Sequence, residues 1–372
     1  MLKHMLFSGG SGIQGDPWVA TFDNSHYNDF QSVAVAPDGS VYACGNTNYD
    51  LLLVKFSSSG TVQWQKTLGS NSRDEGCSVA VAPDGSVYVC GYTSSTGSGD
   101  EVLLLVKFSS SGTVQWQKTL GNDGYTIGYS VAVAPDGSVY VCECTNYDLL
   151  LVKFSSSGTV QWQKILDSSG NVFGYSVAVA PDGSVYVCGD TKLASNEKRC
   201  LLLAKFSSPG TVQWQKTFSG NGDTSGCSVA VAPDDSVYVC GYTNSGKYRD
   251  AVLLLVKFSS SGTVQWQKTF SGRYSVFGES VAVAPDGSVY VCGHHTGNED
   301  ILLAKITDVL IEKDVVTFGS FTFQDTSLTL ENVSFTSTSP SMSVSNAGLT
   351  VKTSSLTMGT PSFTTNLYTY KE

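Results

Sequence analysis

An internal repeat dominates the sequence and constrains its fold more than any other feature. A block close to SVAVAPDGSVYVCG occurs six times, and its proline stands at Pro37, Pro83, Pro135, Pro181, Pro233 and Pro285. A second block, close to LLLVKFSSSGTVQWQKT, lies between the copies, and the period is 46 or 52 residues. A period of this length is typical of one four-stranded propeller blade. The repeat therefore predicts an all-β fold, a six-bladed β-propeller.

Each period divides into four β-runs joined by turns. The runs are SVAVA, VYVCG, LLLVKF and TVQWQKT. Proline presets φ at the second position of the APDG turn and Asp-Gly completes it, so its aspartates are interpreted as turn residues rather than catalytic carboxylates. The alternation of Gln, Trp and Lys in TVQWQKT is typical of an exposed outermost strand.

The two ends of the repeat array predict how the ring closes. The last copy ends at ILLAKI without a TVQWQKT run, whereas PWVATF near the start has no blade of its own. Trp18 precedes Pro37 by 19 residues, the same spacing as Trp64 to Pro83. We therefore expect the N-terminal strand to complete the sixth blade and to remove the open edges.

The predicted domains follow from this reading. They are a leader at 1–15, the propeller at 16–306, a linker at 307–319 and a Ser/Thr-rich β-repeat assembly tail at 320–372.

The repeat resembles the bacterial and phage β-propeller repeat family written around VAV-DG-VYV-G-T and LLL-K-G-W. Its S-x-x-G-T-V-x-W segment is also similar to the tryptophan-docking motif of quinoprotein propellers. That resemblance implies that the indoles pack between adjacent blades, at Trp64, Trp116, Trp162, Trp214 and Trp266, with Trp18 as the sixth. No quinone-binding or calcium-binding constellation accompanies the motif, so we expect no cofactor.

The net charge and the positions of the cysteines limit which molecules this protein can bind and in which cellular compartment it folds. With 32 acidic and 22 basic side chains the net charge is −10, which disfavours nucleic acid as a partner. No apolar run approaches the roughly 18 residues of a membrane span, and the apolar patch near the start is too short for Sec export. Six cysteines share one repeat position, where neighbouring sheets would lie about 10 Å apart, too far for a disulfide. We expect these to be buried, reduced thiols, and assembly in a reducing cytoplasm: Cys44, Cys90, Cys142, Cys188, Cys240 and Cys292.

The loops on the two sides of the predicted ring differ in how much they vary. One side carries the near-constant APDG and SSSG turns, and the other carries loops that differ from copy to copy. Loops on a rigid scaffold often bind ligands, and Tyr among Gly, Ser, Asn and Asp is typical of paratopes and sugar sites. The candidate binding residues are Tyr49, Tyr92, Tyr125, Tyr147, Phe173, Tyr242, Tyr248 and Phe277. Solvated loops without a ligand are the alternative.

Catalytic and metal-binding patterns are sparse. Adjacent His294 and His295 would point to opposite sides of a strand, and Cys142 and Cys144 lack an evident third ligand. We therefore expect neither enzyme activity nor a metal site. A hydrolase or lyase would instead need convergent charged loop residues, for which the candidates are Asp74, Glu75, Arg249, Asp250 and Glu279.

A second repeat, of seven residues, fills the tail from Ser320. Its second position is always apolar, at Phe321, Leu328, Phe335, Met342, Leu349, Leu356 and Phe363. Ser/Thr-rich units with two prolines disfavour a coiled coil and predict a short strand and a turn per unit. Such units resemble phage-fibre stalks, which implies an intertwined homotrimer. The alternatives are an arm that adds strands to another protein and a disordered linker.

These features together suggest a phage virion component made in the host cytoplasm: a tail fibre, a tail-associated protein or a capsid-decorating protein. Its propeller would bind a cell-surface glycan or protein receptor, and its tail would bind itself or other virion proteins. The alternative is a cytoplasmic protein-interaction scaffold.

Overall fold

The computed structural model contains only strands and turns in the residues that it describes. These are residues 21–23 and 28–306, except 71, 95–99, 122–124, 168–170, 193–197, 221, 245–250 and 297–299, together with short strands between 315 and 359. No helix in this part of the chain is long and apolar enough to cross a membrane.

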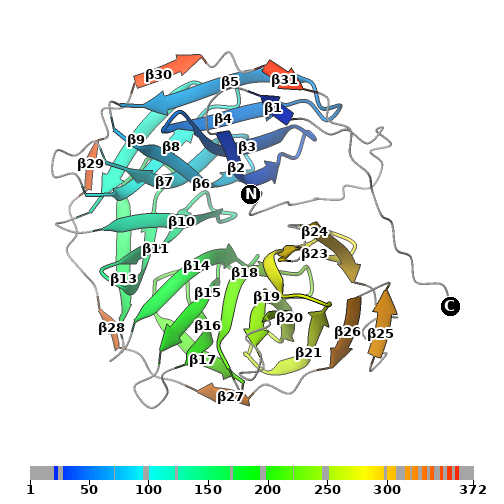
Figure 1. Ribbon diagram of the computed structural model, residues 1–372. Helices are drawn as coiled ribbons and strands as arrows, with labels where there is room; N and C mark the ends of the chain where they lie inside the picture. Colours follow the sequence, from blue (N-terminus) through cyan, green and yellow to red (C-terminus); the bar gives the residue numbers. More distant parts are fainter. Residues whose placement is uncertain are drawn as a thin grey trace.

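Six antiparallel sheets, numbered here in chain order, form the propeller (Figure 1). Sheet 1 contains β2 (Asn28–Val35), β3 (Val41–Thr47), β4 (Asp50–Phe56) and β5 (Val62–Gly69). Sheet 2 contains β6 (Asp74–Val81), β7 (Val87–Thr93), β8 (Val102–Phe108) and β9 (Val114–Leu120). Sheet 3 contains β10 (Thr126–Val133), β11 (Val139–Thr145), β12 (Asp148–Phe154) and β13 (Val160–Asp167).

The second half of the ring repeats this pattern, except that its last sheet has three strands. Sheet 4 contains β14 (Val172–Val179), β15 (Val185–Lys192), β16 (Arg199–Phe206) and β17 (Val212–Ser219). Sheet 5 contains β18 (Thr224–Val231), β19 (Val237–Asn244), β20 (Ala251–Phe258) and β21 (Val264–Ser271). Sheet 6 contains β22 (Val276–Val283), β23 (Val289–His295) and β24 (Asp300–Ile306). The predicted six-bladed propeller is confirmed.

Apolar side chains between neighbouring sheets form the core. Leu51 and Leu53 of sheet 1 pack with Val89, Leu104 and Val106 of sheet 2 in one fully buried cluster. Equivalent clusters join the following sheets, because the VYVCG and LLLV runs are apolar on both faces. The six repeat cysteines are buried here as free thiols, as predicted. Burial raises the pKa of five of them, which are Cys44, Cys90, Cys142, Cys188 and Cys240.

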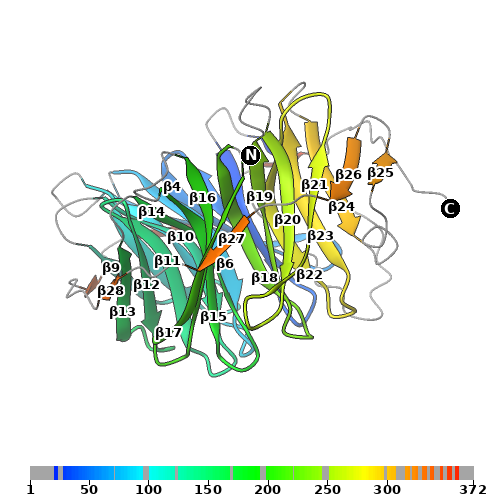
Figure 2. The ribbon, with the colours of Figure 1, turned by 90° about the horizontal axis from the view of Figure 1, so that it is seen from below.

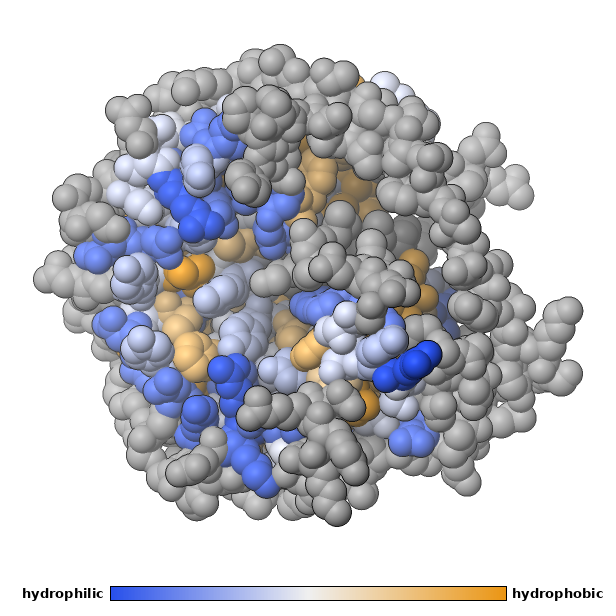
Figure 3. All heavy atoms as spheres, in the orientation of Figure 1, coloured by the Kyte–Doolittle hydropathy of each residue, from blue (hydrophilic) through white to orange (hydrophobic). Residues whose placement is uncertain are grey.

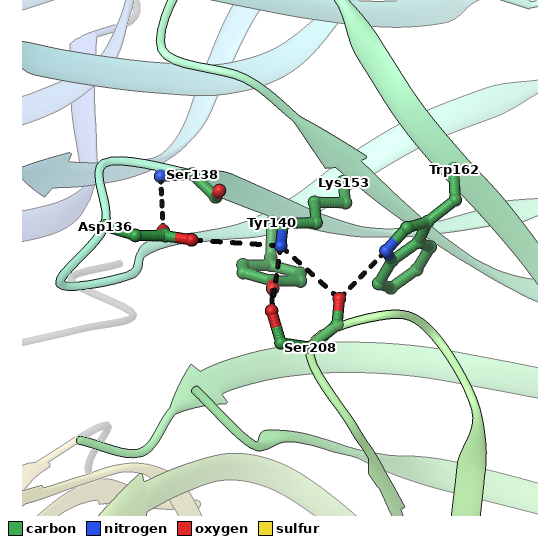
Figure 4. Close-up of polar contacts among 6 residues, drawn as sticks. All are labelled: Asp136, Ser138, Tyr140, Lys153, Trp162 and Ser208. Atoms are coloured by element: carbon green, nitrogen blue, oxygen red, sulfur yellow. Dashed lines mark hydrogen bonds and ion pairs between the residues drawn. The ribbon is translucent and has the colours of Figure 1, made fainter. Parts of the chain in front are cut away.

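The tryptophan motif joins sheets 1 to 4 each to the next one along the chain, and Figure 4 shows the contact between sheets 3 and 4. Trp162 Nε1 donates to the Ser208 carbonyl oxygen at 3.0 Å, and Lys153 Nζ donates to Ser208 Oγ at 2.9 Å. Lys153 also lies 5.2 Å from the ring centroid of Tyr140. A Cβ on Gly210 would lie 3.0 Å from the Trp162 indole, so glycine lets the indole lie flat on the turn.

The same contacts recur along the ring. Trp64, Trp116 and Trp214 donate to the carbonyl oxygens of Ser110, Ser156 and Ser260. Four indoles therefore lie against a turn of the adjacent sheet. Trp18 lies outside the described residues.

The turns on one face of the ring are structural, as predicted. Gly39 adopts a φ of 81°, and the Ser40 amide donates to Asp38 Oδ1 at 2.9 Å. That hydrogen bond lowers the pKa of Asp38. Asp235 takes the glycine position of the fifth copy and keeps a positive φ of 62°.

The C-terminal tail adds a fifth strand to five of the sheets, along the outer rim (Figures 1 and 2). β25 (Val315–Phe318) pairs with β26, and the five added strands are β26 (Phe321–Asp325) on sheet 5, β27 (Thr329–Asn332) on sheet 4, β28 (Thr336–Thr338) on sheet 3, β29 (Val344–Asn346) on sheet 2 and β30 (Thr350–Thr353) on sheet 1. The prediction that TVQWQKT is the outermost strand is therefore wrong for its second half. The exposed edge that we expected to be guarded accepts a strand from the same chain.

The predicted tail residues fall mostly outside the described part. Phe321 begins β26. The others lie outside the described residues: Leu328, Phe335, Met342, Leu349, Leu356 and Phe363. Each of the first six heptad units contains one short strand. These strands pair within one chain, and the homotrimer stays a prediction.

The N-terminal strand has a different partner from the expected one. Its described part, β1 (Thr21–Asp23), pairs with β31 (Thr357–Gly359) of the tail in a separate two-stranded sheet. Among the described strands, β24 has no neighbour other than β23. We expected the N-terminal strand to pair with β24. Its described part, β1, pairs instead with β31 of the tail, a partner that the sequence did not suggest.

Candidate binding face

The described ends of the variable loops lie on the face opposite to the Pro-Asp-Gly turns. Consecutive strands in each sheet are antiparallel, so the loops between the second and third strands and those leading to the next sheet share this face. In sheets 1 to 5 the first strand lies nearest the ring axis (Figure 1). The loop ends of the first two strands therefore surround the mouth of the axis.

Three positions at this end of each sheet differ from copy to copy. The first position is the second residue of the first strand in each sheet: Asp29, Glu75, Ile127, Phe173, Ser225 and Phe277. The second is the residue at the β-bulge of that strand: Gln31, Cys77, Tyr129, Tyr175, Cys227 and Glu279. The third pairs with the first from the second strand: Asn46, Tyr92, Cys144, Asp190, Tyr242 and His294. We call these 18 positions the mouth residues.

The bulge explains why the strands can present these side chains while the core stays constant. It inserts one extra residue into the first strand and locally increases its twist. Opposite it stands a glycine in five copies, because a Cβ on Gly91 would lie 1.8 Å from the Glu75 carbonyl oxygen. Glycine lets the two strands approach this closely in five copies, whereas the third copy has Glu143 at this position.

Aromatic rings cluster at sheets 3 and 4. The Phe173 and Tyr175 rings are stacked with centroids 6.2 Å apart, and Tyr129 meets Tyr175 edge-on at 5.8 Å. Tyr147 from the loop after β11 meets Phe173 edge-on at 6.2 Å. Burial raises the pKa of Tyr129 to about 12, so its hydroxyl stays protonated. These rings form a continuous apolar wall.

A buried carboxylate stands beside this wall. Asp190 Oδ2 accepts hydrogen bonds from Ser225 Oγ at 2.9 Å and Tyr175 at 3.3 Å, and Arg199 lies 3.5 Å away. The Asp190 side chain is 2% exposed, whereas Arg199 is 43% exposed. Burial raises the pKa of Asp190, and the donors and Arg199 oppose this rise. Arg199 is thus held at one end and reaches solvent at the other.

Sheets 5 and 6 form a second aromatic group. Phe277 stacks on His294 with centroids 5.0 Å apart and meets Tyr242 edge-on at the same distance. His294 Nδ1 lies 3.1 Å from Glu279 Oε1. His295 instead contacts Tyr274, so the two histidines diverge as expected. No group of three or more metal-ligating side chains occurs in the described part of the chain.

Two hairpin loops hold tyrosines in a strained conformation. Tyr49 and Tyr147 have φ values of 67° and 71°, and the preceding asparagines also have positive φ. Both tyrosine side chains are 64% exposed. Their carbonyl oxygens accept the amides of Asp74 and Val172 from the next sheet, which fixes each loop.

The remaining predicted binding residues lie at different depths. Tyr125 is 62% exposed, Phe173, Tyr242 and Phe277 are half-buried, and Tyr92 is buried below Arg73. Tyr248 lies outside the described residues. The described members share one face, and contacts join Tyr147 to Phe173 and Tyr242 to Phe277.

The charged candidates for catalysis do not form one group. Asp74 Oδ2 accepts the Ser70 amide and hydroxyl and so stabilises its own loop, while Glu75 pairs with Arg73. Glu279 faces His294, and Arg249 and Asp250 lie outside the described residues.

Sequence reasoning missed the group of Asp190, Arg199 and Ser225, and also missed Glu143. Glu143 stands at the glycine position of the third copy, and its carboxylate is fully buried without a hydrogen-bond partner among the described residues. Comparing the six copies at these positions would have singled out both sites, because aspartate and glutamate are unusual there.

The comparisons with known proteins decide the family. Residues 37–299 match the family model of the outer membrane protein assembly factor BamB. The chain belongs to the BamB-like repeat family. This confirms the quinoprotein-like propeller repeat, and the family indicates no enzyme activity. No curated protein matches the chain.

Solved structures similar to this BamB-like chain agree in fold only. A catalytically inactive virginiamycin B lyase from Staphylococcus aureus, solved with quinupristin, is 10% identical with a TM-score of 0.54, covering 82% of this chain and 97% of the other. The Pan2 WD40 domain of Neurospora crassa is 10% identical with a TM-score of 0.49, covering 79% and 87%. PorZ, of the type-IX secretion system of Porphyromonas gingivalis, is 13% identical with a TM-score of 0.47, covering 78% and 44%. Propellers host unrelated functions, so these similarities assign none to this protein.

Proposed function

We propose that this protein is a non-enzymatic binding protein that recognises its ligand at the mouth of the propeller axis, on the variable-loop face. The observation that supports it best is the pattern of difference between the copies. The core and the turns of the opposite face are nearly constant, whereas the mouth residues differ from sheet to sheet. A ligand that crosses the axis meets a different chemical group on each sheet, and such asymmetry is what specific recognition requires.

The ligand class that fits best is a saccharide. A sugar ring has an apolar C–H face and a rim of hydroxyl groups. The wall of Tyr147, Phe173 and Tyr175 offers the flat apolar surface, and Arg199, which the buried Asp190 holds beside it, can donate to hydroxyls. Hydrophobic and hydrophilic residues lie side by side near the middle of the ring in Figure 3.

The strained tyrosines support a binding role independently. A non-glycine residue at positive φ costs about 1 kcal/mol or more, and glycine would avoid that cost. Exposure of a large aromatic ring adds no folding energy in return. Each of these tyrosines lowers the stability of the fold and exposes its ring on the recognition face. Such residues are expected where binding, rather than stability, determines the sequence.

A glycan array tests the proposal with matched variants. We expect the full-length protein to retain a defined set of saccharides, and Tyr49→Gly and Tyr147→Gly to weaken that binding without lowering the thermal midpoint. Asp235→Gly relieves a positive φ on the opposite face, so it should raise the midpoint and leave binding unchanged. Loss of stability in the tyrosine variants would show that they are structural and would contradict the proposal.

A protein ligand is the second candidate, because propellers are common protein-interaction folds and the mouth has a paratope-like composition. Pull-down of one host protein, abolished by Tyr147→Gly and without array binding, would favour this scaffold role.

A role in a phage virion is the most specific form of the proposal. It is supported by the phage-type repeat together with a fibre-like heptad sequence. The comparisons, which include a lyase and a WD40 domain, add no support for it. Light scattering on the full chain tests the associated homotrimer, and a monomer would count against it.

A further inference from the structure

Three exposed tyrosines mark three consecutive boundaries between sheets on the variable-loop face. Tyr49 lies where sheet 1 meets sheet 2, Tyr125 where sheet 2 meets sheet 3, and Tyr147 where sheet 3 meets sheet 4. Their side chains are 64%, 62% and 64% exposed, and no other aromatic side chain in the described part of the chain exceeds 44%. Because packed sheets lie about 10 Å apart, the three rings form a row about 20 Å long.

Backbone hydrogen bonds hold this row in place. The carbonyl oxygens of Tyr49 and Tyr147 accept backbone amides from the next sheet along the chain. Beside Tyr125, the Thr126 amide of sheet 3 donates at 2.8 Å to the carbonyl oxygen of Glu101, which directly precedes β8 of sheet 2. A largely exposed ring adds little to the burial energy of the fold. The three rings are therefore fixed in position without being part of the core.

An arginine held by a largely buried carboxylate stands at each end of this row. At sheet 2, Arg73 pairs with Glu75, and their side chains are 51% and 15% exposed. At sheet 4, Arg199 pairs with Asp190, and their side chains are 43% and 2% exposed. A guanidinium group has five N–H donors, so each arginine keeps donors that its carboxylate does not use. Both ends of the row thus combine an exposed aromatic ring with an oriented donor group.

Duplication of the repeat does not explain why the two ends are alike. The hairpin sequence TNYD is identical in sheets 1 and 3, so duplication can account for its two tyrosines. The arginines stand at different positions of the repeat. Arg73 directly precedes the first strand of sheet 2, where sheet 4 has Asn171, and Arg199 begins the third strand of sheet 4, where sheet 2 has Glu101. The same chemistry at both ends, built from different positions, favours a ligand that presents the same group twice.

We propose that this row binds a neutral, linear saccharide chain along its length, an inference that rests on the proposed function and specifies its ligand. Successive sugar rings lie on the three tyrosines, and Arg73 and Arg199 donate to hydroxyl groups at the two ends. One sugar cannot reach both ends of a row about 20 Å long, whereas a chain of several units can. The net charge of −10 disfavours an anionic polymer.

Chain-length series of three neutral polymers test this inference in the full-length protein. The probes are malto-, cello- and N-acetylchito-oligosaccharides of one to eight units, and titration calorimetry gives the Kd of each. We expect the Kd of at least one series to fall at least tenfold once the chain reaches both ends, because the second contact is then intramolecular. This gain should disappear in Tyr49→Gly and in Tyr147→Gly. It should persist in Asp235→Gly, which relieves a positive φ on the opposite face.

The outcomes separate this inference from the proposed function. A Kd that does not change with chain length would overturn the inference and leave the proposed function intact, because a short saccharide would then suffice. A gain with length that survives in both tyrosine variants would also overturn it, since the chain would then follow another path. Binding of none of the three series would do the same. A glycan array on which the wild type retains no saccharide would instead overturn the proposed saccharide binding itself.

Discussion

Glu143 gives this protein a stability that should fall as the pH rises. It occupies the position at which the other five copies have Gly45, Gly91, Gly189, Gly241 and Gly293. Its side chain is fully buried, and neither carboxylate oxygen has a hydrogen-bond partner among the described residues. Burial therefore raises the pKa of Glu143 well above its ordinary value of 4.5.

The sign and size of the effect follow from proton linkage. Above pH 4.5 the unfolded chain releases the Glu143 proton while the folded protein keeps it, so the folded state is disfavoured increasingly as the pH rises. The folded state therefore loses no stability to Glu143 below the pKa of this residue in the unfolded chain. The loss grows as the pH rises from that value to the pKa of Glu143 in the folded protein. In that window the free energy of unfolding falls by about 1.4 kcal/mol per pH unit from this residue alone.

Urea unfolding of wild type and Glu143→Gln at pH 5, 6 and 7 measures this contribution. Glutamine keeps the shape and cannot ionise, so the variant should become steadily more stable than wild type as the pH rises. Glu101→Gln removes a partly exposed carboxylate and serves as the control with no such trend. If the pH profiles of wild type and Glu143→Gln run parallel, the reasoning from burial is wrong.

Three further predictions concern the repeat itself. Trp116→Ala removes the 3.1 Å hydrogen bond to the Ser156 carbonyl and the indole over Gly158, and should lower the free energy of unfolding in urea by about 2 kcal/mol. Gly91→Ala places a Cβ 1.8 Å from the Glu75 carbonyl oxygen and should lower the thermal midpoint more than Gly287→Ala, where the Cβ has no close neighbour and the cost comes only from the positive φ of 83°. The Ser86 amide lowers the pKa of Asp84, so wild type should lose stability as the pH falls through that pKa, and Asp84→Asn should show a shallower acid transition.

Most of the propeller could be predicted because the repeat states the same structure six times. Period, turn residues and apolar runs fixed the number of sheets, the strand order and the inter-sheet position of Trp64 and its counterparts. The partners of the tail could not be predicted this way. Any exposed strand edge can accept a short strand, and a heptad such as SLTLENV contains no feature that identifies the sheet with which it will pair.

The candidate site was predicted at the level of the face but not of its chemistry. Tyr49 and Tyr147 were found because aromatic residues in variable loops stand out. Asp190 and Arg199 were missed because they lie nine residues apart, on two strands, and only the hairpin register brings them together. Glu143 was missed because a single departure from a repeat does not by itself reveal that the side chain is buried, and burial is what gives this residue a distinct titration.

Hydrogen–deuterium exchange on the full chain, with and without the best-retained array glycan, tests most directly where this propeller binds. We predict slower exchange on ligand addition in peptides that contain the Asn48-Tyr49 and Asn146-Tyr147 loops and the loop ends of β14 and β15. Protection confined to the Pro-Asp-Gly turns of the opposite face would contradict the assignment of the recognition surface.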